Sequence, residues 1–217
     1  MSERTSERDI VVRQPAGKAS ALVLLFHGVG ATPEGLVPLG ELIADALPGA
    51  AVVSVRSPAP SDLGGGYQWF SVRGVDEANR PARVDAAMPA FAQTVRDWQA
   101  RTGVAPDATT LLGFSQGAIM ALEATQRVPG LASRVVALAG RFAEPPQTAP
   151  GAAVHWLHGE QDGVIPAAWA GQGVAQLRAL GAAVMLDLVP GLGHGVDARM
   201  ARQVLERLAP SPNPEPS

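Results

Sequence analysis

The chain of 217 residues contains no cysteine. This excludes disulfide bonds, metal sites built on thiolates, and a cysteine nucleophile. Charge is sparse as well: charged residues make up 17% of the chain, the formal net charge is −3, and Lys18 is the one lysine. Nucleic-acid-binding proteins carry a basic patch, and surface membrane anchors combine basic residues with an apolar face. Since neither pattern is present, we expect no nucleic-acid partner and no stable membrane anchor.

Long hydrophobic runs are also missing. No apolar run approaches the roughly 18 residues that a membrane-spanning helix needs. The segment Met1–Asp9 is polar with mixed charge, and it lacks the basic and then apolar layout of a secretory signal. We therefore expect a cytoplasmic protein. No pattern in the sequence indicates an oligomeric state, so an oligomer stays open.

Hydrophobic residues nevertheless make up 47% of the chain, enough for a substantial core in one domain. Short apolar runs alternate with helical patterns from one end to the other. The expected strands are Ile10–Arg13, Ala21–Phe26, Ala51–Val55, Thr109–Gly113, Arg134–Leu138, Ala153–Leu157 and Val184–Val189. Most are almost continuously apolar, as parallel strands covered on both faces are. We expect the first strand to pair antiparallel with the second through the turn at residues 15–17.

Helical patterns fill the segments between these strands. The expected helices are Gly35–Leu47, Arg83–Arg101, Gln116–Arg127, Ala167–Leu180 and Asp197–Leu208. Pro89 lies inside the second helix, so this helix is expected either to kink there or to begin later. The alternation predicts an α/β fold with a mostly parallel central sheet of about seven strands and helices on both faces. We expect one domain over residues 1–209 and a disordered proline-rich tail over residues 210–217.

The segment Gly113-Phe114-Ser115-Gln116-Gly117 carries a Gly-x-Ser-x-Gly pattern between a predicted strand and a predicted helix. A serine in such a strand-to-helix turn lies at the carboxyl edge of the sheet, and the glycines let other parts of the chain approach closely. The amino end of the helix favours developing negative charge. The bare pattern is weak evidence, but its position between a strand and a helix indicates that Ser115 is the nucleophile of a serine hydrolase.

A serine hydroxyl needs a general base and an acid that orients the base. Where the nucleophile lies in such a turn, the acid and then the base follow it along the chain. Asp162 lies in the turn directly after the Ala153–Leu157 strand, and His194 lies in the turn after the final strand. All three side chains thus come at carboxyl ends of parallel strands, where ligands bind in open α/β sheets. We predict a triad of Ser115, Asp162 and His194.

Other acidic and histidine side chains are weaker candidates. Glu160 remains an alternative for the acid because it lies in the same turn as Asp162. Asp187 lies within an apolar strand, and Asp197 precedes the last helix, which it is expected to cap. The remaining histidines precede Asp162 and so break the expected order, and we predict buried, hydrogen-bonded structural roles for them. These are His27, His155 and His158.

Acyl transfer also needs hydrogen-bond donors for the oxyanion. We expect one donor to be the backbone N–H of Gln116, directly after the nucleophile. The second is expected from the glycine-rich turn after the Ala21–Phe26 strand, where we choose Val29, with Gly28 and Gly30 as alternatives.

Four segments together resemble the carboxylesterase/phospholipase family of α/β-hydrolases, which includes acyl-protein thioesterases and small bacterial esterases. They are Leu25–Gly30, Gly113–Ala118, His158–Pro166 and Gly193–Gly195. Gly66–Phe70 also looks like the aromatic segment that these proteins carry before a long helix. The similarity spans about residues 20–205. Ala31-Thr32 stands where many members have an acidic residue, and this makes the chain look closer to the small bacterial esterases.

The resemblance implies an α/β-hydrolase fold and a serine esterase that uses no cofactor and no metal ion. It also implies the triad and the oxyanion donors predicted above. Acyl thioesterase or lysophospholipase-type activity is the alternative within this family, and a non-catalytic ligand-binding protein of the same fold is the alternative outside it.

The substrate is expected to be a small-molecule ester with a short or medium acyl chain, because no insertion is long enough for a helical lid. Trp69 and Phe70 lie in the longest irregular stretch, and they either line the substrate pocket or cap the edge of the core. Ile165, together with Pro166 and Trp169, is expected on the opposite wall of the pocket.

Overall fold

The computed structural model describes residues 9–209, so the predicted tail at residues 210–217 lies outside the described residues. Its main sheet has seven strands in the order β1-β3-β2-β6-β7-β8-β9. These strands are β1 (Ile10–Arg13), β2 (Ala21–Phe26), β3 (Ala50–Val55), β6 (Thr109–Phe114), β7 (Arg134–Leu138), β8 (Ala153–Gly159) and β9 (Val184–Val189). Every predicted strand is present, and the mostly parallel sheet is confirmed.

The pairing of β1 differs from the prediction. β1 pairs antiparallel with β3, with Ile10 opposite Ser54 and Val11 opposite Val53, and it does not pair with β2. Both edges of β2 are occupied by parallel partners, β3 on one side and β6 on the other. A hairpin between β1 and β2 was therefore a wrong expectation, because β2 has no free edge and β1 takes the edge of the sheet.

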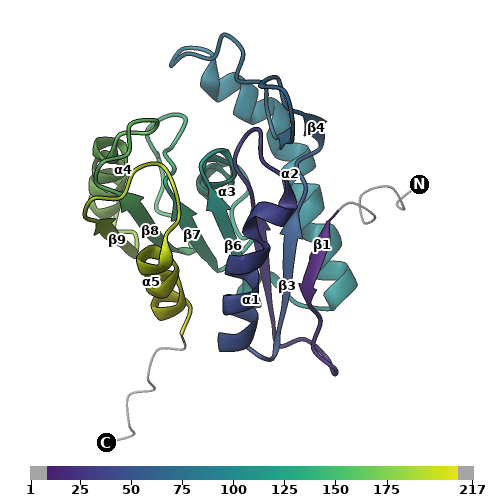
Figure 1. Cartoon of the computed structure of the whole chain (residues 1–217). Helices are drawn as coiled ribbons and strands as arrows, with labels where there is room; N and C mark the ends of the chain where they lie inside the picture. Colours follow the sequence, from purple (N-terminus) through teal and green to yellow (C-terminus); the bar gives the residue numbers. More distant parts are fainter. Residues whose placement is uncertain (1–8, 210–217) are drawn as a thin grey trace, which may run out of the picture.

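Helices cover both faces of the sheet (Figure 1). They are α1 (Val37–Ala46), α2 (Arg80–Thr102), α3 (Gln116–Arg127), α4 (Ala167–Ala179) and α5 (Ala198–Leu208). Each face of the sheet has its own apolar core. The strand β2 contributes to both, because successive side chains of a strand point to opposite faces. Leu22 and Leu24 pack with apolar residues of α2, α3 and α4, whereas Val23 and Leu25 pack with those of α1 and α5.

Two helices differ in detail from the prediction. A short 3-10 helix, η1 (Pro33–Leu36), precedes α1, which begins at Val37. The helix α2 begins at Arg80 and continues through Pro89 to Thr102. Proline removes one backbone hydrogen bond, but residues on both sides of Pro89, including Val84 and Phe91, are fully buried in the core. Their packing outweighs the local cost.

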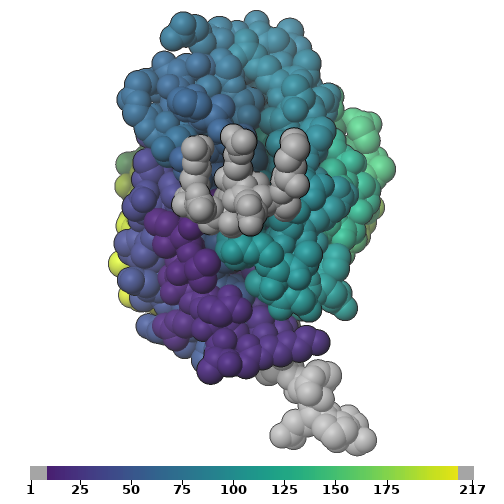
Figure 2. Space-filling view, turned by 90° about the vertical axis from the view of Figure 1, so that its right-hand side faces the viewer, coloured from purple at the N-terminus to yellow at the C-terminus, as the bar shows by residue number. Residues whose placement is uncertain are grey.

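The segment between β3 and α2 stands at the top of the molecule, beyond the ends of the strands (Figure 1), and the blue atoms at the top of Figure 2 show it from the side. It contains a two-stranded pair, β4 (Ala59–Pro60) and β5 (Tyr67–Gln68), and an isolated bridge joins Tyr67 to Ala31. This segment therefore extends over the carboxyl ends of the parallel strands, where the predicted site residues lie. Within residues 9–209, no helix is both long and apolar enough to cross a membrane.

Candidate active site

Ser115 lies between β6 and α3 in a backbone conformation that few residues other than glycine adopt. Its φ of 53° and ψ of −114° fall outside the allowed regions for residues that carry a Cβ. Such backbone strain is found mainly at functional sites. Its backbone N–H donates to the carbonyl oxygen of Leu138 in β7 at 2.9 Å. The neighbouring strand thus holds the turn while the Ser115 side chain projects from it.

Both glycines of the pattern are required by close backbone contacts. A Cβ on Gly113 would lie 2.3 Å from the carbonyl carbon of Gly117, and one on Gly117 would lie 2.1 Å from the carbonyl oxygen of Phe26. Gly28 also approaches closely, because a Cβ there would lie 3.1 Å from the Cβ of Ser115. The glycines therefore let α3 start against β2 and let the Gly28 turn pass beside Ser115.

The side chains of Ser115, His194 and Asp162 form a continuous line of hydrogen bonds. The Nε2 atom of His194 is 2.9 Å from Ser115 Oγ, and its Nδ1 atom is 2.7 Å from Asp162 Oδ2. These residues come from turns that are 79 and 32 positions apart in sequence. Gly159 allows this meeting, since a Cβ there would lie 2.4 Å from the carbonyl oxygen of Gly193.

Asp162 is buried, and each of its carboxylate oxygens is hydrogen-bonded. Oδ1 accepts the backbone N–H groups of Val164 and Ile165 at 2.9 and 2.8 Å, while Oδ2 faces His194. Burial by itself raises the pKa of Asp162, but the hydrogen bonds from His194, Ile165 and Val164 outweigh it and lower the pKa below the usual value. Asp162 is thus an ionised carboxylate fixed in one orientation toward His194.

The predicted oxyanion donors lie next to Ser115. Val29 and Gln116 line the same cleft as Ser115. Gly30, one of the alternatives, donates its N–H to the carbonyl oxygen of Tyr67 at 3.0 Å and is therefore not free. Within residues 9–209, no backbone hydrogen bond outside the helices and strands uses the N–H of Val29. The turn itself is held by His27, whose Nδ1 is 2.8 Å from the carbonyl oxygen of Gly28.

The side chain of Gln116 has a structural role that the sequence did not reveal. Its Oε1 accepts the backbone N–H of Trp69, and its Nε2 donates to the carbonyl oxygen of Phe70, both at 2.8 Å. The residue after the nucleophile thereby fixes the aromatic segment against the turn. Its spacing of 46 and 47 residues from these partners leaves no local pattern from which the contact could be predicted.

The cleft beside Ser115 has a volume of about 180 Å³. Phe70 and Ile165 line it, together with Trp169 from α4. Trp69 does not: it is 5% exposed and packs edge-on against Phe91 with ring centroids 4.9 Å apart. Of the two roles left open for Trp69, the structure thus gives it the one in the core. The reason is that a gap between β2 and α2 accepts the indole ring.

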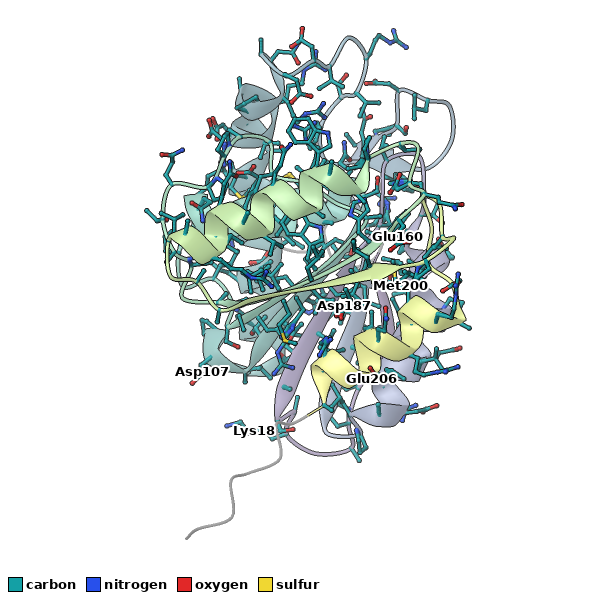
Figure 3. All side chains as sticks on the ribbon, turned by 90° about the vertical axis from the view of Figure 1, so that its left-hand side faces the viewer. Lys18, Asp107, Glu160, Asp187, Met200 and Glu206 are labelled. Atoms are coloured by element: carbon teal, nitrogen blue, oxygen red, sulfur yellow. The ribbon has the colours of Figure 1, made fainter. Side chains whose placement is uncertain are left out.

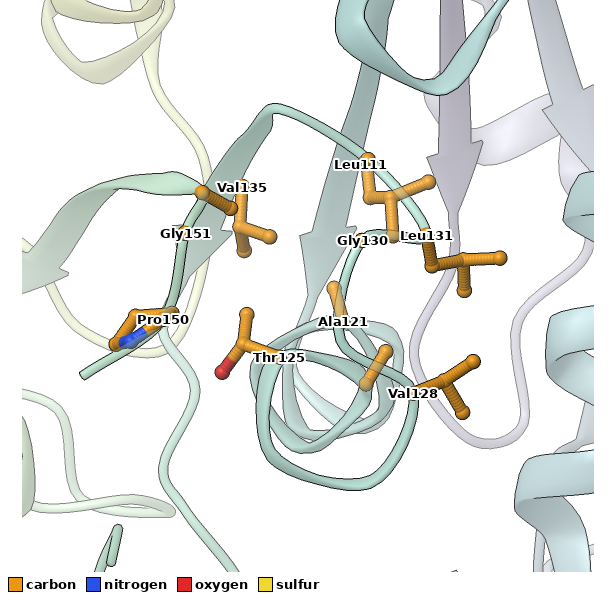
Figure 4. A pocket seen from close by; sticks show the side chains of 12 residues that line it. Leu111, Ala121, Thr125, Val128, Gly130, Leu131, Val135, Pro150 and Gly151 are labelled. Carbon is orange, nitrogen blue, oxygen red and sulfur yellow. The ribbon is translucent and has the colours of Figure 1, made fainter. Parts of the chain in front are cut away.

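A second cavity lies near the amino ends of the parallel strands, beside the segments that precede β7 and β8. Figure 4 shows its lining, which is mostly aliphatic and includes Leu111, Ala121 and Val135. Its volume is about 10 Å³, close to the minimum that holds one water molecule. This cavity is therefore too small to be a candidate substrate site.

The other acidic candidates have different environments from that of Asp162. Asp197 caps α5 by accepting two backbone N–H groups, and Asp187 on β9 pairs with Arg207 of α5. Glu160 is exposed on the turn after β8 (Figure 3). Within residues 9–209, Asp162 alone of these acids pairs with His194.

The three other histidines have different environments. His27 accepts the N–H of Ser57 at its Nε2, 3.1 Å away, and its burial lowers its pKa. His158 is fully buried, with Nε2 2.7 Å from the carbonyl oxygen of Ile165 and 3.2 Å from Asp162 Oδ2. This contact with Asp162 was missed from the sequence. His155 is only half-buried and its Nδ1 has no partner among the described residues, so a hydrogen-bonded role was wrong for it.

Comparisons with known proteins agree with this architecture. A family model described as phospholipase/carboxylesterase matches residues 7–210. Esterase YpfH of Escherichia coli K12 is 49% identical over 199 residues, covering 91% of this chain and 86% of the relative. Acyl-protein thioesterase 1 of Kluyveromyces lactis is 29% identical, covering 71% and 75%. The crystal structure of esterase PE8 superposes with a TM-score of 0.82 at 29% identity, covering 90% and 95%. The chain therefore belongs to the phospholipase/carboxylesterase family of α/β-hydrolases and is itself a hydrolase.

Proposed function

We propose that this protein is a serine esterase that hydrolyses carboxylic esters through Ser115, His194 and Asp162. The observation that carries the proposal is the unbroken line of hydrogen bonds from Ser115 Oγ through His194 to Asp162. It is the arrangement in which an imidazole takes the proton of a serine while a carboxylate fixes the imidazole tautomer. The strained turn at Ser115 supports the same role.

The first half of the reaction forms an acyl-enzyme. His194 Nε2 takes the proton of Ser115 Oγ as this oxygen attacks the ester carbonyl carbon. The negative charge that develops on the carbonyl oxygen is stabilised by the backbone N–H groups of Val29 and Gln116. The tetrahedral intermediate then collapses. The carbonyl group re-forms, the bond between its carbon and the oxygen of the alcohol part breaks, and His194 donates its proton to that oxygen, so that the alcohol leaves.

The second half releases the acid. His194 takes a proton from a water molecule, whose oxygen attacks the acyl carbon, and the oxyanion again lies at the N–H groups of Val29 and Gln116. When the tetrahedral intermediate collapses, the proton on His194 returns to Ser115 Oγ. Throughout, Asp162 stabilises the imidazolium form of His194.

Labelling by a fluorophosphonate probe tests this proposal against a ligand-binding protein of the same fold. We expect stoichiometric modification on Ser115, identified by mass spectrometry of the labelled peptide, because only a serine activated by a base attacks such probes quickly. Heat-denatured protein is the control and is expected to remain unlabelled. A folded protein that fails to react would favour the binding protein and contradict the esterase proposal.

We further propose a preference for short or medium acyl chains. The cleft of about 180 Å³ is smaller than the roughly 300–1,000 Å³ of typical pockets for drug-sized ligands. With p-nitrophenyl esters, we expect kcat/KM for butyrate to exceed the value for palmitate by about tenfold or more. A tenfold preference for palmitate would overturn this part of the proposal.

An acyl thioesterase is the second candidate, since one relative is an acyl-protein thioesterase and the same groups attack thioesters. Comparing butyrate as its p-nitrophenyl ester and as an alkyl thioester separates the two activities. No cofactor or metal ion takes part in the proposed steps. A cytoplasmic location stays a prediction from the sequence.

A further inference from the structure

The cleft beside Ser115 contains two arginine side chains that the proposed mechanism does not use. Arg80, the first residue of α2, and Arg141, in the segment after β7, both line it. The other lining residues are apolar or uncharged, so that no carboxylate contributes to this lining. An unusually positive surface thus faces the reacting serine in a protein whose formal net charge is −3.

The carboxylate that pairs with both arginines lies outside the cleft. Glu77 accepts a hydrogen bond from Arg141 Nη1 at 2.9 Å and one from Arg80 Nη2 at 3.1 Å. Glu77 lines the neighbouring groove, on the other side of Arg141, and its side chain is 59% exposed. The hydrogen bonds from Arg141 and Arg80 keep the pKa of Glu77 below its usual value. One ionised carboxylate therefore balances two guanidinium groups, and a net positive charge remains.

Arg141 is held rigidly. Its side chain is 7% exposed, its Nε donates to the carbonyl oxygen of Phe142, and its guanidinium carbon lies 3.5 Å from the ring centre of Trp169. Stacking on an aromatic face leaves the in-plane N–H groups of a guanidinium free to bind oxygen atoms. Three of the five N–H donors are used by Phe142 and Glu77, so two remain.

Arg80 also has N–H donors that no hydrogen bond uses within residues 9–209. Its Nε is buried, and within residues 9–209 it has no hydrogen-bond partner. A buried donor without a partner is unfavourable, and more so when the group is charged. An apolar acyl chain in the cleft would remove water from both guanidinium groups and replace none of their hydrogen bonds. An anionic oxygen would accept hydrogen bonds from their unused terminal N–H groups, with the charge-assisted geometry that arginine favours.

We propose that Arg80 and Arg141 form an anion subsite beside Ser115, and that the preferred esters carry a carboxylate in addition to the ester group. This inference rests on the proposed function, because it names the substrate class for the same site. The carboxylate belongs either to the acyl part, as in a monoester of a dicarboxylic acid, or to the alcohol part, as in an ester of a hydroxy acid.

Two pairs of matched esters test the proposal and distinguish these sources. Monoethyl glutarate is compared with ethyl valerate, and the butyrate ester of 3-hydroxypropanoate with propyl butyrate, by titration of the released acid. In one pair at least, we expect kcat/KM to be about tenfold or more higher for the anionic ester. The pair that responds identifies the part that carries the carboxylate. Equal or lower values for the anionic ester in both pairs would overturn the proposal.

Charge variants give effects of opposite sign that a structural role of the arginines would not produce. Arg80→Gln is expected to lower the preference for the anionic ester about tenfold or more, with partial recovery in Arg80→Lys. Glu77→Gln is expected to raise the preference because it removes the balancing carboxylate. Arg96→Gln, the same substitution at an exposed position on α2, is the control and should not change it.

The results also separate this inference from the proposed function. Hydrolysis of neutral esters with labelling at Ser115, but without any preference for anionic esters, would reject the anion subsite alone. A protein that hydrolyses no ester and takes no label would reject the proposed function. If Arg80→Gln and Glu77→Gln lower turnover of neutral and anionic esters by the same factor, the two side chains are only structural and the inference is wrong.

Discussion

Replacing Ser115 with alanine is expected to lower kcat for p-nitrophenyl butyrate by about 10⁶-fold, the scale found when the nucleophile of a serine triad is removed. Alanine keeps the Cβ, so the strained turn at φ 53° and the contact with Gly28 remain. What is lost is the oxygen that forms the acyl-enzyme. Residual turnover would come from the backbone donors of the oxyanion site.

A matched control is Ser133→Ala, at the opposite end of the sheet, where the hydroxyl makes one long contact of 3.4 Å with Thr109. This variant is expected to keep wild-type kcat. The thermal midpoints of both variants should lie close to that of the wild type, so that the loss can be assigned to chemistry. If Ser115→Ala kept a tenth of the wild-type activity, Ser115 would not be the nucleophile.

Replacing Asp162 with asparagine is expected to lower kcat by about 10⁴-fold. Asparagine has nearly the same shape, and its carbonyl oxygen can still accept the N–H groups of Val164 and Ile165. Its amide group, however, donates a hydrogen bond toward His194 Nδ1, where the carboxylate accepted one. His194 would then carry its proton on Nε2 and could not take the proton of Ser115.

The control for this variant is Glu160→Gln in the same turn. Glu160 is exposed, and we expect its replacement to leave kcat within about twofold of the wild type. The comparison is made under steady-state conditions at neutral pH with the same ester. A large loss in Glu160→Gln together with a small loss in Asp162→Asn would instead make Glu160 the acid.

Much of the fold follows from local sequence patterns. Continuous apolar runs located the strands, and β2, β7 and β9 have the predicted bounds. The helix α3 also has its predicted bounds, between the turn at Ser115 and Val128. The reason is that burial on both faces of a parallel strand, or on one face of a helix, leaves a period that depends only on neighbouring residues.

The strand that pairs with β1 could not be predicted from local sequence patterns. Because β3 and β6 occupy the two edges of β2, β1 pairs at the outer edge of β3, and this is a property of the whole sheet. The position of Trp69 was undecided for a similar reason. An aromatic side chain in a long loop can point into a cleft or into the core, and the space between β2 and α2 decided it.

For the candidate site, the sequence by itself determined the edge of the sheet at which Ser115, Asp162 and His194 lie. Chain order and strand ends are local information, and parallel strands bring their carboxyl ends together. Only the tertiary structure decided the contacts between side chains, such as His158 with Asp162 and the Gln116 amide with Phe70. Likewise, nothing in the spacing of Arg80 and Arg141 shows that both face the nucleophile. Contacts over such separations depend on how helices and loops pack, and packing leaves no period in the sequence.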